Sequence, residues 1–160
     1  MGEVFSVNIS HKKGTSKREV PEVVAVENCG IREDAHFGFS HRQISLLSWE
    51  EIERQNAYLK EKKVYNFNLK PGDFAENITT KGLDLSKLEV GDKMRIGEEV
   101  LLEVTQIGKE CHDLCEISKK IGKCIMPRKG VFARVLRGGR IKKGDFIVVM
   151  KDEDSCCHGK

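Results

Sequence analysis

The sequence lacks an apolar run of the roughly 20 residues that a membrane span needs, and it does not begin with the apolar segment of a secretory signal. Aromatic residues make up only 6% of the chain. An excess of one charge is also missing, because 28 lysines and arginines are interspersed with 25 aspartates and glutamates. We therefore expect a cytoplasmic protein with no membrane partner. Without a dense basic face, no nucleic-acid partner is expected either.

Disulfide bridges are not needed to hold this fold together. A single domain of 160 residues buries about 70% of the surface that its unfolded chain exposes. The six cysteines lie unevenly, at positions 29, 111, 115, 124, 156 and 157. In a chain without a secretory signal, such cysteines are expected to be reduced. Reactive or metal-binding thiols are therefore favoured.

Short runs of β-branched and aromatic residues, separated by glycine and aspartate turns, predict seven to nine strands. Ser48 and Glu51 form a capping box that predicts a helix through about Lys62, and apolar spacing predicts a second, short helix over 113–121. Gly138 and Gly139 are expected to form a turn. This pattern predicts a mainly β fold, a barrel or sandwich with helical insertions. The strands are expected at 2–10, 19–27, 42–47, 93–96, 100–107, 131–136 and 146–150, and 74–79 is expected as a strand or an extended segment.

The domain is expected to span residues 1–150, followed by a flexible tail over 151–160. The tail is polar and contains Cys156, Cys157 and His158. A flexible thiol pair can bind metal or pass sulfur to another cysteine, but an uninvolved tail is the simpler interpretation.

The stretch from Lys109 to Cys124 holds three cysteines and one histidine in sixteen residues. Near neutral pH, thiols and imidazole serve as soft metal ligands, sulfur carriers or nucleophiles. For Cys111, Lys109 favours the ionised thiol, and Gly108 lets a large ligand approach the backbone. These residues mark the stretch as the chemical centre of the chain.

Three uses remain open for the other thiols of this stretch. Together with His112, Cys115 and Cys124 can bind zinc, but their spacing matches no recognised structural zinc pattern, so zinc is not favoured. Cys115 can also act as a resolving thiol for a persulfide or sulfenate on Cys111. Alternatively, it packs in the core as a small apolar residue.

An ordered set of motifs covers almost the whole chain. The motifs are Gly30-Ile31 with Asp34-Ala35-His36 and Gly38, Arg42 to Leu47, Pro71-Gly72 with Phe74 and Glu76-Asn77-Ile78-Thr79, Leu88 with Gly91-Asp92 and Arg95-Ile96-Gly97, Cys111, and Gly130 to Val135 with Gly144-Asp145. As a set they resemble the MOSC domain, the C-terminal domain of molybdenum cofactor sulfurases, which also occurs as stand-alone prokaryotic proteins. The resemblance implies a closed β-barrel and binding of, or sulfur delivery to, a molybdenum-pterin cofactor.

The resemblance also assigns roles to residues. Cys111 takes the place of the family's characteristic cysteine, which ligates molybdenum in reductase relatives and is proposed to carry sulfur in sulfurases. The pterin phosphate needs cationic and hydrogen-bond donor groups. The candidates within or beside the matching motifs are His36, Arg42, Asn77, Thr79, Lys109 and Arg134. Each has a structural alternative: either arginine can pair with Glu76 or Asp34, and His36 can cap a loop.

The expected function is therefore cofactor binding or sulfur carriage, with a possible sulfurtransferase-like activity. A cysteine desulfurase or a molybdoenzyme is the expected partner, because the chain has no pyridoxal-lysine domain of its own. One alternative is a small molybdenum-dependent oxidoreductase acting on N-hydroxylated substrates, although the chain has no room for the extra N-terminal domain of such relatives. The other is a zinc-binding or thiol interaction module.

Overall fold

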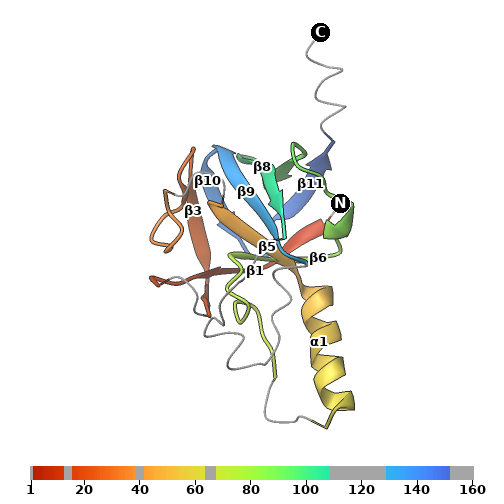
Figure 1. Cartoon of the computed structure of the whole chain (residues 1–160). Coiled ribbons are helices and arrows are strands. Elements are labelled where there is room, and N and C mark those ends of the chain that lie inside the picture. The colour runs from red at the N-terminus through yellow and green to blue at the C-terminus, as the bar shows by residue number, and fades with distance from the viewer. Residues whose placement is uncertain (1, 13–15, 39–41, 64–67, 109–128, 152–160) are drawn as a thin grey trace.

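The computed structural model describes residues 2–12, 16–38, 42–63, 68–108 and 129–151. A closed barrel lies at its centre (Figure 1), because β1 pairs with β11 and completes the ring of strands. The expected mainly β fold with a closed barrel is thus confirmed. In order around the ring, the seven strands are β11 (Phe146–Met150), β7 (Lys93–Ile96), β8 (Val100–Ile107), β9 (Val131–Arg137), β5 (Ile44–Ser48), β6 (Ile78–Lys81) and β1 (Gly2–Ile9).

A second, three-stranded sheet is formed by β10 (Gly139–Lys142), β3 (Glu22–Val26) and β4 (Gly30–Ile31). The single run expected at 19–27 is divided at Pro21, which has no N–H for a strand ladder. Its first part is β2 (Arg18–Val20), which pairs with β1, and its second part is β3.

The turn expected at Gly138 and Gly139 is wrong for the second glycine, which begins β10 opposite Ala25. The reason is close packing. A Cβ on Gly138 would lie 2.4 Å from the carbonyl oxygen of Ala25, so glycine is needed where β9 leads into β10 beside β3.

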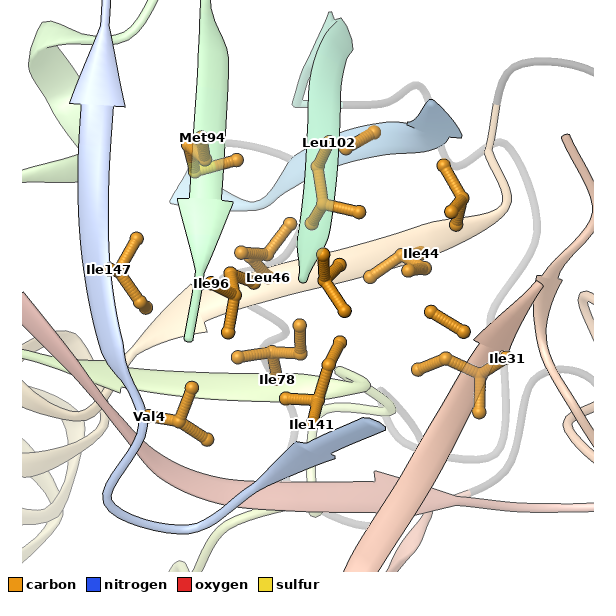
Figure 2. Close-up of a cluster of buried hydrophobic side chains, with 14 of the residues drawn as sticks. Val4, Ile31, Ile44, Leu46, Ile78, Met94, Ile96, Leu102, Ile141 and Ile147 are labelled. Atoms are coloured by element: carbon orange, nitrogen blue, oxygen red, sulfur yellow. The ribbon is translucent and has the colours of Figure 1, made fainter. Parts of the chain in front are cut away.

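The barrel interior is filled with apolar side chains. Figure 2 shows Leu46, Ile78 and Ile96 from barrel strands pointing into one cluster. Ile31 and Ile141 from the small sheet join the same cluster, and each is fully buried. The interior is therefore a packed core, and a ligand site has to lie on the outer face or at an end of the barrel.

The helix α1 (Trp49–Glu61) extends away from the barrel (Figure 1). Its expected start is confirmed, because the Ser48 hydroxyl accepts a hydrogen bond from the Glu51 amide at 3.1 Å. Ile52 is buried in a second apolar cluster between the helix and the outer face of the barrel. Trp49 stacks on Phe5 of β1, with ring centroids 4.8 Å apart. These contacts fix the first turn of the helix against the barrel.

Replacing Ser48 by alanine is expected to lower the free energy of unfolding by about 1 kcal/mol, because the Glu51 amide loses its acceptor. Urea denaturation followed by circular dichroism measures this loss. Glycine at the same position should cost only a few tenths of a kcal/mol. Equal stability of the alanine variant and the wild type would contradict the capping role.

The chain around β6 differs from the sequence expectation. The stretch 74–79, expected as a strand or an extended segment, forms a strand only from Ile78. Before it, the side chains of Glu76 and Asn77 accept hydrogen bonds from the Gly72 and Ser45 amides. One short 3₁₀ helix, η1 (Leu85–Lys87), follows β6.

Two expectations fall outside the described residues, namely the helix over 113–121 and the tail beyond Lys151. Lys151 itself is held to the barrel, with its Nζ 2.7 Å from Asp92 Oδ2. Within the described residues, no helix is long and apolar enough to cross a membrane.

Candidate ligand-binding site

The chain leaves the barrel at Gly108, after β8, and returns at Gly130, before β9. The Gly108 amide donates a hydrogen bond to the Gly130 carbonyl at 2.7 Å. The segment between them contains Lys109 and Cys111, and both lie outside the described residues. Its two ends therefore meet at one point on the edge of the barrel.

A cavity of about 600 Å³ lies beside this point. Glu50 and Arg54 from the first turns of α1 form one wall, and Asp84 from the loop after β6 forms another. Ile107 and Lys129, which flank the Cys111-containing segment, complete the lining. A ligand in this cavity would therefore lie next to the two ends of the segment that contains the predicted reactive cysteine.

Two carboxylates of the cavity are fixed by backbone amides. Glu50 Oε2 accepts from the Gly82 amide at 2.8 Å, while Glu50 Oε1 is buried and has no hydrogen-bond partner among the described residues. Asp84 Oδ1 accepts from the Ser86 amide at 3.0 Å. Hydrogen bonds from Ser86 lower the pKa of Asp84, so this carboxyl is ionised near neutral pH. Arg54 pairs with Glu51 at the rim.

Asn77 and Thr79 belong to a buried polar network on the outer face of the barrel. Asn77 Oδ1 accepts from the Ser45 amide at 3.0 Å, and Asn77 Nδ2 donates to the Asn8 carbonyl at 3.2 Å. Thr79 Oγ1 donates to Glu76 Oε2 at 2.7 Å. Both predicted ligands are fully buried, so direct contact with a cofactor would first require these bonds to open. Their ligand role stays a prediction.

Glu76 in this network is fully buried as well. Burial, with a smaller contribution from the charge of Asp73, raises its pKa to about 7, although hydrogen bonds from the Gly72 amide and Thr79 oppose the shift. The carboxyl is therefore half protonated near neutral pH. From the sequence, Glu76 was named only as part of a motif and as a partner for an arginine, and its burial was not expected, because a polar residue in a strand or loop gives no sign of burial in the sequence.

His36 lies beside a buried ion pair. Asp34 Oδ1 is 2.8 Å from Lys17 Nζ, and Asp34 Oδ2 accepts from the His36 amide at 3.1 Å. The His36 ring nitrogen Nδ1 lies 3.5 Å from the same Asp34 oxygen. Lys17 follows β1 in a polar stretch of the sequence, yet its side chain is only 1% exposed. No sequence signal near Lys17 indicates this, because its partner lies seventeen positions further along the chain.

The two predicted arginines lie apart from the cavity lining. Arg134 Nε and Nη2 contact Glu103 Oε1 at 2.7 and 2.6 Å, in place of the suggested pairing with Glu76 or Asp34. Arg42 Nε is buried without a hydrogen-bond partner in the described part of the chain. Arg42 lies just before the start of β5, whereas the cavity lies at the other end of this strand, next to Ser48. A five-residue strand spans roughly 13 Å, which separates Arg42 from the cavity. The structure therefore does not gather the predicted ligands into one pocket.

Metal binding by the described side chains alone is not indicated, since no three of their His, Cys, Asp or Glu residues are arranged to hold an ion. Cys29 is a free, partly exposed thiol. The zinc alternative rests on His112, Cys115 and Cys124, which lie outside the described residues.

The comparisons with known proteins identify the family. The chain is similar in fold to the YuaD protein from Bacillus subtilis, with a TM-score of 0.73 and 19% identity over 94% of this chain and 96% of that chain. It is also similar to YiiM from Geobacillus stearothermophilus, with a TM-score of 0.66 and 20% identity over 97% and 82% of the two chains. YiiM from Escherichia coli gives a TM-score of 0.66 and 19% identity, over 98% and 76%. No curated protein matches the sequence. The MOSC domain family model matches residues 32–148, and the chain therefore belongs to the MOSC domain family.

Proposed function

We propose that this chain binds a molybdenum-pterin cofactor and carries sulfur for it, with Cys111 as the reactive residue. The observation that supports this proposal most is the match to the MOSC domain over residues 32–148, which include Cys111. A cavity of about 600 Å³ at the two ends of the segment containing Cys111 gives the ligand a place beside it. The packed barrel interior leaves such an edge as the place for binding.

Two buried atoms without partners among the described residues suit such a ligand. Glu50 Oε1, in the cavity lining, is an acceptor that the N–H groups of a pterin would satisfy. Arg42 Nε lies apart from that lining and is a cationic donor that a phosphate or other anionic oxygen reaching beyond the cavity would satisfy. Arg134, with its side chain 44% exposed, offers further donors to solvent. When bound, the cofactor supplies a redox-active metal for which a thiolate such as that of Cys111 is a soft ligand.

The sulfur transfer would be an exchange between a persulfide and a thiolate. The Cys111 thiolate attacks the terminal sulfur of a persulfide on a partner cysteine desulfurase. A new S–S bond forms at Cys111, the S–S bond of the donor breaks, and the partner's cysteine leaves as a thiolate. No net oxidant is needed, because the sulfane sulfur moves between two thiols. Lys109, two residues before Cys111, favours the thiolate that starts this step.

Incubation of the purified protein with a cysteine desulfurase and cysteine should add one sulfur atom to Cys111, detected as a mass gain on the peptide that contains it. Cys111→Ser should abolish this gain. Cys29→Ser removes a free thiol in the turn between β3 and β4 and serves as the matched control that should keep the mass gain. Persulfide formation on several cysteines alike, or on none, would count against Cys111 as a sulfur carrier.

Native mass spectrometry of protein from a cofactor-producing host tests cofactor binding separately. A bound pterin in the wild type that is lost in Cys111→Ser would support ligation by this thiol. Stoichiometric molybdenum together with reduction of N-hydroxylated substrates would instead favour the oxidoreductase.

A further inference from the structure

We infer that Glu50 is the residue that recognises the heterocycle of the bound ligand, by accepting hydrogen bonds from a 2-amino-4-oxopyrimidine edge such as that of a pterin. This inference rests on the proposed function for the identity of the ligand. Its structural basis is the cavity between α1, the loop after β6 and the ends of β8 and β9.

The position of the Glu50 carboxylate is fixed before any ligand arrives. Its backbone lies in the first turn of α1, and Glu50 Oε2 is held by the Gly82 amide at 2.8 Å. The other oxygen, Oε1, is buried without a partner among the described residues. A buried acceptor without a donor costs free energy. Because Glu50 lines the cavity, a donor on a ligand bound there would supply the partner that Oε1 lacks.

The remaining cavity lining suits a flat heterocycle. Leu83 and Ile107 supply apolar surface next to Glu50, and Ile107 is 44% exposed, whereas Leu85 and Val131 are almost fully buried. The ring of the ligand would pack on this apolar surface while its N–H edge faces the carboxylate.

The charges around the cavity indicate which edge of a ligand is accepted. Glu50 and Asp84 are both held by backbone amides and favour N–H donors over a purely anionic group. Arg54 and Lys129 line the same cavity and can contact an anionic substituent such as a phosphate. The cavity therefore offers acceptors for the N–H donors of a ligand and cations for an anionic substituent of the same ligand. Adenine lacks the 2-amino-4-oxopyrimidine edge and should be discriminated against.

The test is a fluorescence titration of the full chain with pterin, the bare heterocycle. In Glu50→Gln the amide oxygen keeps the Gly82 bond, so an NH₂ group replaces Oε1 and faces the donors of the ligand. Binding should weaken at least tenfold. Glu53→Gln makes the same change on an exposed position of α1 outside the cavity lining and should leave affinity unchanged. Equal affinity of the wild type and Glu50→Gln would overturn the inference.

A blocking variant establishes whether pterin binds in this cavity. Ser86→Trp places a large side chain at the cavity while retaining the Ser86 backbone amide that caps Asp84, and it should also abolish pterin binding. Thermal unfolding of each variant verifies the fold.

A second titration compares pterin with nucleosides. Guanosine carries the same 2-amino-4-oxopyrimidine edge as pterin, whereas adenosine lacks this edge and serves as the negative control. Guanosine binding tighter than pterin would assign the cavity to a guanine nucleotide and overturn the pterin assignment.

The outcomes separate this inference from the proposed function. A pterin retained by Glu50→Gln from a cofactor-producing host but lost by Cys111→Ser would overturn the role of Glu50 and leave the proposed function standing. If the wild type neither retains a cofactor nor forms a persulfide at Cys111, the proposed function fails. Glu50-dependent binding of free pterin would then still support the cavity assignment, and no binding of free pterin would overturn it.

Discussion

Lys17→Met is expected to lower the free energy of unfolding by about 3–5 kcal/mol, the usual cost of removing one partner of a buried ion pair. Lys17 Nζ lies 2.8 Å from Asp34 Oδ1, and the two side chains are 1% and 0% exposed. Methionine fills a similar volume, so the loss comes from leaving the Asp34 carboxylate without its counter-charge. Urea denaturation at pH 7 measures it. A loss below about 1 kcal/mol would contradict this account.

The double variant Lys17→Met with Asp34→Asn is the matched control, because it removes both charges and should recover part of the lost stability. The pH dependence gives a second check. Burial alone would raise the pKa of Asp34, but hydrogen bonds from His36 and the charge of Lys17 outweigh it and hold this pKa below the ordinary value of 3.8. A carboxyl whose pKa is lower in the folded protein than in the unfolded chain stabilises the fold at pH values above 3.8. This contribution is lost as the pH falls below that value. The difference between wild type and Lys17→Met should therefore shrink in acid.

Glu76 is expected to make the fold less stable as the pH rises from about 4.5 to about 7. Burial raises its pKa from 4.5 to about 7, so over this range the folded protein binds more protons than the unfolded chain. Raising the pH therefore favours unfolding, and the loss levels off above the folded pKa. At about 1.4 kcal/mol per pKa unit, the full effect is about 3 kcal/mol.

Glu76→Gln isolates this effect from other titrating groups. Its amide oxygen can still accept from the Gly72 amide and from Thr79, but it no longer titrates. Urea denaturation of wild type and variant at pH 5 and pH 8 should show a smaller fall in stability for the variant. Glu53→Gln, at an exposed position of α1, should follow the wild type. Parallel pH profiles for Glu76→Gln and the wild type would refute the assignment.

The secondary structure could be predicted where local pattern decides it. The alternation of apolar residues in Val100 to Ile107 predicts β8, and the Ser48 cap predicts the start of α1; the structure has both. Closure of the barrel by β1 and β11 joins the two ends of the described chain, and no local signal records that pairing. β10 was missed because Gly138 indicates a turn in sequence, whereas in the structure it makes room for the Ala25 carbonyl.

The candidate site was harder to predict than the fold. The resemblance singled out Asn77 and Thr79 as donors, but burial and hydrogen bonding engage both side chains within the protein. Glu50 was overlooked because two adjacent glutamates at a helix start are ordinary partners of the helix dipole. Only the cavity, and the missing partner of its Oε1 atom among the described residues, distinguish it.

The hydrogen bond between Gly108 and Gly130 has a consequence for how this scaffold can vary. Because it brings residues 22 positions apart in sequence to 2.7 Å, the segment that contains Cys111 starts and finishes at one place on a barrel that closes without it. The entropy of closing such a loop rises only with the logarithm of its length. Insertions, deletions or exchange of the whole segment should therefore leave the barrel folded. The same barrel can then carry segments with different reactive residues while the neighbouring cavity is kept.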